Sequence, residues 1–210
     1  MARDFNLDTN AAKEANNGGK RITDVGVYVG TFRAAWYEKN DKGTESVQLI
    51  FVSDAGQEAG PLALYTHNGA GDELPSNKML HAILASMKVR GMKAQPGKVT
   101  LWDYDTKSEV EKTKETYPAM MGPTIGLVLT DEEYKNRNGD VKTRIQIGMA
   151  FNSETRQSAA EVLGSETATA LDNYTAYLDK TGRWHKTING SHAPSQAANA
   201  PTFDDDDIPF

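Results

Sequence analysis

The sequence contains no cysteine, which excludes a disulfide framework and any zinc site built on cysteine ligands. Its four histidines, at positions 67, 81, 185 and 192, show no metal-ligand spacing among themselves. The motifs of phosphate-binding loops, nucleophilic serines and zinc proteases are also missing. We therefore expect no cofactor, no metal and no enzyme activity.

Long hydrophobic runs are lacking as well. No stretch approaches the roughly 20 apolar residues that a transmembrane helix requires, and residues 1–20 contain no signal-peptide core. We expect a cytoplasmic protein with no membrane partner. The 29 acidic and 23 basic residues give a formal net charge of −6, and Asp204, Asp205, Asp206 and Asp207 supply four of the negative charges. The rest of the chain is close to neutral, which is compatible with a nucleic-acid partner.

Alternating apolar residues predict a mainly β fold. Val25, Val27 and Val29 alternate with polar residues or glycine, and the turn-forming residues 40–43 separate them from an apolar run at 47–52. Further strands are expected at 61–65, 99–104, 125–129 and 141–151. The last two would form a hairpin, with alternate residues from Val141 to Phe151 on one face. Residues 106–116 are expected to form a charged connection.

One segment changes to the helical period. From Met79 to Met87 the apolar residues lie on one helical face, with Ser76 placed to cap its start and Gly91 its end. One helix between the third and fourth strands, followed by more strands, is the order of an OB-type antiparallel barrel, although other small antiparallel barrels share it. Two short helices are expected within a helical appendage at about 155–182.

Composition divides the chain into four parts. Residues 1–20 form a polar leader and residues 21–188 a folded domain. Residues 189–203 are small, polar and interrupted by proline, which is typical of a flexible linker. Residues 204–210 form an acidic tip, where four adjacent aspartates repel one another, so we expect a disordered tail.

A stretch without acidic residues carries the clearest binding signal. Between Glu73 and Asp103 there are five basic residues and no acidic one. Single-stranded nucleic acids are bound without sequence preference by cations that follow the phosphates and by aromatic rings that stack on the bases. Strand aromatics could equally belong to the core, and a lysine stripe could be a solvated surface. The candidate DNA-binding residues are Arg33, Trp36, Tyr37, Lys88, Arg90, Lys93, Lys98, Trp102, Tyr104 and Arg144.

The last residues combine two chemical demands. Phe210 fits an apolar pocket while its carboxylate meets an arginine, and the aspartates suit a basic rim. Pro209 reduces the entropy lost on ordering. We interpret the segment as a protein-interaction tip made of Asp204, Asp205, Asp206, Asp207, Ile208, Pro209 and Phe210.

The tip resembles the acidic tip of bacterial single-stranded-DNA-binding proteins. This resemblance implies an OB barrel that coats single-stranded DNA, a linker, and a tip that recruits replication, recombination and repair enzymes. The body departs from that family, since its opening strand pattern is absent and residues 1–20, 106–123 and those after Phe151 are additional. In size and layout the chain is similar to the single-stranded-DNA-binding proteins of tailed bacteriophages, which would place it in the host bacterial cytoplasm.

Three alternatives remain open from the sequence. The protein could bind no DNA and use its tip as a decoy for host replication enzymes. It could be a strand-annealing recombination protein that forms a ring-shaped homo-oligomer. A metal-dependent nuclease would use Asp103 and Asp105, with the acidic residues at 131–133.

Overall fold

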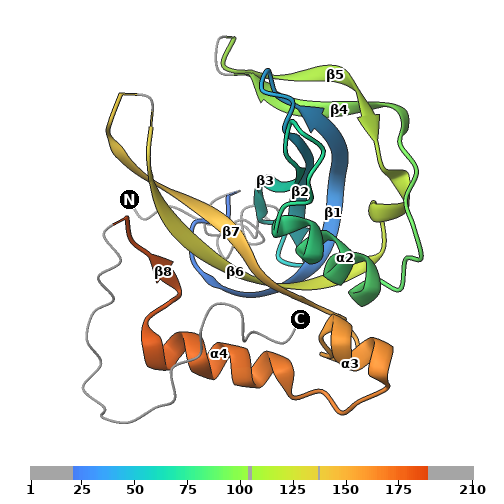
Figure 1. Cartoon of the computed structure of the whole chain (residues 1–210), viewed down its shortest axis with the longest axis vertical. Helices are drawn as coiled ribbons and strands as arrows, with labels where there is room; N and C mark the ends of the chain where they lie inside the picture. The colour runs from blue at the N-terminus through green and yellow to red at the C-terminus, as the bar shows by residue number, and fades with distance from the viewer. Residues whose placement is uncertain (1–20, 104–105, 137, 189–210) are drawn as a thin grey trace, which may run out of the picture.

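The computed structural model describes residues 21–103, 106–136 and 138–188. The predicted leader, linker and tip lie outside these ranges, as do Tyr104 and Asp105. Within them the chain is mainly β, with one largely antiparallel sheet of eight strands and a few short helices (Figure 1). The expected fold class is confirmed at this level.

The first three strands form an antiparallel meander, made of β1 (Gly26–Lys39), β2 (Glu45–Ser53) and β3 (Glu58–His67). The side chain of Asn40 builds the first turn, because its Oδ1 accepts hydrogen bonds from the backbone N–H groups of Lys42 and Thr44, both at 2.9 Å. This confirms the hairpin predicted from residues 40–43. A bulge at Arg33 interrupts the ladder between β1 and β2 and bends β1.

The predicted helix is α2 (Ser76–Ser86), which packs Met79, Leu80 and Ile83 against the sheet. Its expected ends were wrong. Pro75 precedes the helix and no side chain caps it, and the helix ends at Ser86, with Met87 as its C-cap, and not at Gly91. The chain leaves the helix because Lys88 adopts a left-handed φ of 58°.

Residues 106–116 are not a connection, which corrects the sequence expectation. Most of them belong to β5 (Ser108–Thr116), which forms a regular antiparallel hairpin with β4 (Gln95–Asp103). Only Val110 among the residues of β5 is a large apolar residue, so apolar alternation could not reveal the strand. The ladder is instead supported by cross-strand ion pairs, Lys98 with Glu111 at 2.6 Å and Lys112 with Asp103 at 3.2 Å.

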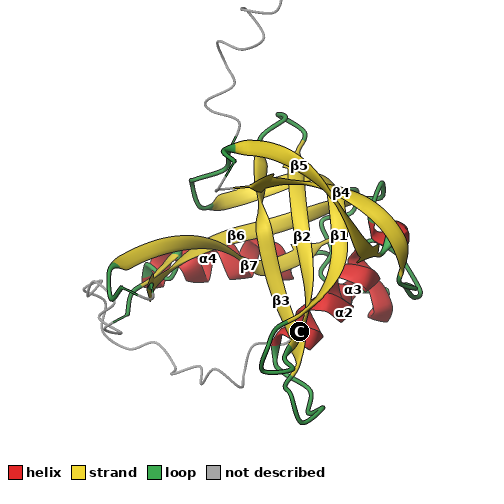
Figure 2. Ribbon diagram, turned by 90° about the horizontal axis from the view of Figure 1, so that it is seen from above, coloured by secondary structure: helices red, strands yellow, loops and turns green. Residues whose placement is uncertain are grey.

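A long hairpin follows the short 3₁₀ turn at Pro118–Met120. It consists of β6 (Thr124–Lys135) and β7 (Val141–Phe151), and its far end extends away from the other strands (Figures 1 and 2). Ile147 pairs with Leu129 and Met149 with Val128, so Gly148 is an extra residue that forms a bulge.

This bulge corrects the expected alternation along β7. Ile145 and Ile147 pack against the main core, whereas Met149 and Phe151 pack beneath a helix on the other side of the hairpin. A side chain at position 148 would force neighbouring side chains to shift, because a Cβ there would lie 2.8 Å from the hydroxyl oxygen of Tyr174 and 2.9 Å from Cγ2 of Thr130.

The two short helices expected near the end of the domain are present. They are α3 (Ala159–Gly164) and α4 (Ala170–Thr181), followed by β8 (His185–Lys186), which pairs in parallel with β6. Glu161 joins the two helices, because its carboxylate accepts hydrogen bonds from the backbone N–H groups of Ser158, Thr169 and Ala170. One buried side chain therefore caps both α3 and α4.

The sheet curls but does not close. Five strands pair in the order β3-β2-β1-β6-β7, and β3 approaches β7 at the two ends of this series. The β4–β5 hairpin joins the sheet through β1, where Trp36 pairs with Thr116 of β5. No ladder of hydrogen bonds joins β3 to β7 among the described residues. The curled sheet and α2 enclose the main core, which includes Phe32, Leu49 and Phe51.

Two smaller cores lie outside this curl. Trp36, Ile50 and Val99 pack between the β1–β2 face and the β4–β5 hairpin. On the other side, Leu171 and Leu178 of α4 pack against the β6–β7 hairpin. The β4–β5 hairpin and α4 thus each cover part of the outer surface of the curled sheet.

Candidate nucleic-acid interface

The connection between α2 and β4, residues 87–94, alternates between anchored and exposed side chains. Met87 is buried, and Val89 and Met92 pack against the main core. Next to these anchors in the sequence, the side chains of Lys88, Arg90 and Lys93 are exposed. Apolar contacts therefore fix a short loop that presents its three cations to solvent. We call these three residues the cation cluster.

The cation cluster has no acidic partners in the part of the chain that the structure describes. None of its members forms a salt bridge with a residue in the described ranges. An unpaired surface cation can meet a phosphate without first giving up a carboxylate, so the release of counterions from the phosphates contributes in full to binding.

A hollow of about 550 Å³ lies beside the cluster and is lined by Arg90, Gly91 and Met92 of the connection. Two half-buried tyrosines, Tyr37 and Tyr117, form part of its wall. A second hollow of about 460 Å³ shares those three connection residues and continues to Lys93, Gln95 and Ala119. The structure thus brings predicted residues Tyr37, Arg90 and Lys93 together.

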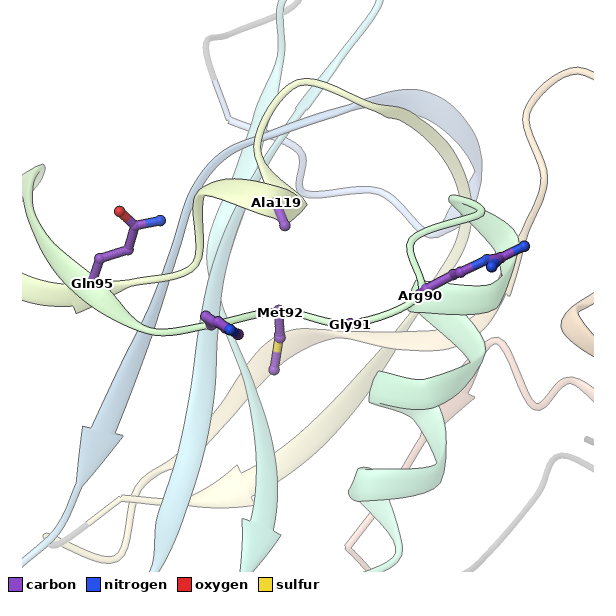
Figure 3. A pocket seen from close by; sticks show the side chains of 6 residues that line it. Arg90, Gly91, Met92, Gln95 and Ala119 are labelled. Carbon is purple, nitrogen blue, oxygen red and sulfur yellow. The ribbon is translucent and has the colours of Figure 1, made fainter.

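Figure 3 shows how the second hollow is arranged around the connection. The side chains of Arg90 and Gln95 lie at opposite ends of this stretch, and Ala119 faces it from the 3₁₀ turn. Gly91 presents only backbone between them, and a Cβ added there would meet no atom within 4 Å.

One carboxylate, that of Glu45, also lines the first hollow. Hydrogen bonds from Lys39 and then from Tyr37 lower its pKa, so Glu45 is ionised at neutral pH. The Lys39 Nζ lies 3.2 Å from the Glu45 Oε1, so this negative charge has its own counter-ion. The positive charge of Arg90 at the rim is therefore not neutralised by Glu45.

Three other predicted cations are engaged in the structure. Arg33 forms a two-pronged contact with Glu58 of β3, at 3.0 and 3.2 Å, and Lys98 pairs with Glu111. Arg144 pairs with Glu132 at 2.7 Å and also lies over the ring of Tyr134. The structure does not bring these three side chains to the cation cluster, since they lie on β1, β4 and β7.

The two predicted tryptophans have different surroundings. Trp36 is not available for base stacking, because its side chain is buried in the second core and its Nε1 donates to Glu38 at 3.0 Å. Trp102 is 54% exposed on β4. Its neighbours across the ladder are acidic, however, with Glu109 opposite Trp102 and Glu111 opposite Thr100. Glu111 is paired with Lys98, but the carboxylate of Glu109 opposite Trp102 disfavours a phosphate beside this ring. Tyr104 lies outside the described residues.

Two of the acidic residues considered for a nuclease are paired with cations, since Asp103 contacts Lys112 and Glu132 contacts both Arg144 and Lys186. Asp131 contacts the ring of His185, Glu133 accepts a hydrogen bond from the backbone N–H of Ile188, and Asp105 lies outside the described residues. Burial raises the pKa of Glu132, but hydrogen bonds from Arg144 and Lys186 outweigh burial and leave it lowered. Within the described ranges, no group of three or more histidine, aspartate or glutamate side chains is arranged to hold a metal ion.

Sequence reasoning missed several residues of the hollows. Tyr117, His67 and His81 come from a segment after β5, from the end of β3 and from α2. They carry no common spacing in the sequence, and only the fold brings them together. Met92 and Ala119 are likewise lining residues without a recognisable motif.

Comparison with known proteins gives no family. No protein-family model matches the chain, and no curated protein shows significant similarity to it. The described helices include none that is both long enough and apolar enough to cross a membrane.

Proposed function

We propose that this protein binds single-stranded DNA without strong sequence preference and takes part in DNA replication, recombination and repair, as a phage-encoded protein in the host bacterial cytoplasm. The observation that carries the proposal is the cation cluster, which stands unpaired beside a hollow walled by Tyr37 and Tyr117. Cations for phosphates and flat rings for bases are what such binding requires. The protein acts by coating the strand and not as an enzyme.

The arrangement of the strands supports an OB-type barrel as the scaffold. The series β3-β2-β1-β6-β7 places β1 between β2 and β6, and α2 follows the third strand. In this interpretation β4 and β5 form an inserted hairpin, and α3 and α4 are an appendage. OB-type barrels commonly bind oligonucleotides.

The acidic tip, residues 204–210, supplies the second activity in this proposal. Its aspartates and Phe210 suit a partner surface that combines a basic rim with an apolar pocket. Replication and repair enzymes would be recruited to DNA that the domain has coated. In full-length protein, Phe210→Ala should leave DNA binding unchanged and abolish capture of those enzymes by DNA-bound protein.

Fluorescence anisotropy with labelled oligo-dT tests the DNA-binding domain. The triple variant Lys88→Ala/Arg90→Ala/Lys93→Ala should bind at least about tenfold more weakly than wild type at low salt. Losing three phosphate contacts should also reduce the slope of log affinity against log salt by roughly 2, at about 0.7 per contact for single strands. Thermal unfolding should be nearly unchanged, because all three side chains are exposed.

Lys180→Ala serves as the control for charge. Lys180 is also exposed and forms no salt bridge with any described residue, but it lies on α4. If the triple variant bound as tightly as wild type, the cation cluster would not be the interface. If wild type did not bind oligo-dT at all, the proposal would fail and the decoy alternative would gain support.

A further inference from the structure

The first hollow lies at one end of the β1–β2–β3 meander. Tyr37 is near the end of β1, Glu45 begins β2, and His67 ends β3, while α2 closes the opposite side through Leu80 and Leu84. The hollow is therefore a mouth at one end of the curled sheet and not part of an outer face. Mouths of β-barrels are frequent sites for small ligands, and about 550 Å³ lies within the usual range of 300–1,000 Å³.

The lining of this mouth combines apolar and aromatic surface with a polar rim. Val47, Leu80 and Leu84 supply apolar side chains, and Tyr37 and Tyr117 supply rings. Burial raises the pKa of Tyr117, and burial together with a hydrogen bond to Glu45 raises that of Tyr37, so both phenols stay neutral. A flat, uncharged group can lie against such rings, and base stacking on aromatic side chains is worth roughly 1–3 kcal/mol per base.

We propose that the mouth takes one nucleobase of the bound single strand, stacked on Tyr37 or Tyr117, while Arg90 and Lys93 contact the adjoining phosphates. This inference rests on the proposed function and adds a site to it. The lining favours a nucleotide over an anion alone, since the hollow offers apolar side chains and rings together with polar groups such as Thr66 and Asn77, while the unpaired cations lie on the connection beside it.

Gly91 leaves room for the bound DNA to pass between the two hollows. Both hollows are lined by Arg90, Gly91 and Met92, so a DNA strand that extends from one hollow into the other crosses this segment. At Gly91 no side chain obstructs the crossing (Figure 3). The second hollow then offers Lys93 and Gln95 to the next nucleotide.

Gly91→Leu is the most direct way to obstruct the mouth without removing a charge. A Cβ at this position meets no atom within 4 Å, and Gly91 is not among the glycines with a positive φ, so the fold can accept the new side chain. Full-length Gly91→Leu should bind labelled oligo-dT roughly tenfold more weakly, which corresponds to the loss of one stacked base.

Ala94→Leu is the matched control. Ala94 is exposed in the same connection but lines neither hollow, so this variant adds the same side chain outside the proposed path and should bind as wild type does. Equal affinities of Gly91→Leu and wild type would overturn the base site. That result would leave the proposed function intact, because the wild type would still bind.

Photocrosslinking locates the base itself. Wild-type protein bound to an oligonucleotide carrying 5-iododeoxyuridine is irradiated, and the crosslinked residue is identified by mass spectrometry. A crosslink at Tyr37 or Tyr117 is expected. Crosslinks confined to exposed aromatic residues elsewhere, such as Trp102 or Tyr134, would overturn the inference whatever the affinity of Gly91→Leu. Absence of any binding by the wild type would instead refute the proposed function.

Discussion

Lysines five positions apart in this chain have opposite surroundings. Lys93 lies in the connection between α2 and β4, exposed and without a salt bridge to any described residue. Lys98 lies on β4 and is also exposed to solvent, but its Nζ is 2.6 Å from Glu111. The difference comes from the fold, because the connection crosses a region without acids whereas β4 is paired with the glutamate-rich β5.

The comparison extends to the whole molecule. Several charged side chains of the hairpins and of the helical appendage are used for internal contacts, such as Arg33 with Glu58 and Arg156 with Asp172. Those of the cation cluster are not. A basic residue in a sequence therefore indicates a phosphate site only when the fold leaves it without a carboxylate. Internal partners and DNA compete for the same cation.

The largest change in stability is expected at Trp36, which was predicted to bind DNA but packs in the second core. Trp36→Ala should reduce the free energy of unfolding by about 3–5 kcal/mol, because it removes a buried indole from the second core. Chemical denaturation measures this loss. Trp102→Ala is the matched variant, and its cost should stay below about 1 kcal/mol because Trp102 is 54% exposed. Equal costs would contradict the assignment of the two tryptophans to different surroundings.

A second large effect should appear at Glu161, whose charge serves only the fold. Burial raises its pKa, but hydrogen bonds from Ser158, Thr169 and Ala170 outweigh burial and lower the pKa to about 2. A carboxylate with a lowered pKa stabilises the protein above its unfolded pKa, and this contribution is lost as pH falls from about 4.5 towards 2. The contribution at neutral pH is roughly 3 kcal/mol.

Glu161→Gln should therefore lose stability at neutral pH and show a flatter decline in acid than wild type. Urea unfolding over a series of pH values measures both. Affinity for oligo-dT at neutral pH should not change, because Glu161 lies in the appendage and not at the mouth. If the free energy of unfolding of wild type and of Glu161→Gln depended on pH in the same way, the hydrogen bonds of the Glu161 carboxylate to α3 and α4 would not be the source of this stabilisation.

The smallest expected effect is the difference in oligo-dT affinity between variants of Lys93 and Lys98. Lys93→Ala should weaken binding of oligo-dT about three- to tenfold at low salt and lower the salt slope by roughly 0.7, the value for one phosphate contact. Lys98→Ala should change affinity less than about twofold, because Glu111 already holds its charge. Its stability should change by less than about 1 kcal/mol, as for other exposed ion pairs. A greater loss of affinity at Lys98 than at Lys93 would reverse the comparison.

Much of the fold follows from local patterns in the sequence. The Asn40 turn, the apolar face of α2 and the β6–β7 hairpin, whose turn contains Gly139, are all encoded by neighbouring residues. The strand β5 was missed because cross-strand ion pairs support it in place of apolar alternation. The bulge at Gly148 was missed because an extra residue becomes visible only when the partner strand is known.

The candidate interface was predictable only in part. The absence of acids between Glu73 and Asp103 indicated a basic stretch, but not which of its cations are paired. Lys88, Arg90 and Lys93 form no salt bridge with a described residue, whereas Lys98 of the same stretch pairs with Glu111 of β5. Whether a given tryptophan faces the core or solvent depends on which hairpin covers the strand, and the sequence does not encode this locally. Tyr117 joins Tyr37 only through the packing of the segment after β5 against β1, where its backbone N–H donates to Ala35 at 2.9 Å.

One titration tests the central claim most directly. Full-length wild-type protein is titrated into labelled oligo-dT at about 50 and about 200 mM salt and followed by anisotropy. We expect tight binding at low salt that weakens steeply at the higher concentration, because the unpaired cations of the connection release counterions from the phosphates. Absence of binding, or an affinity that does not change with salt, would contradict the account.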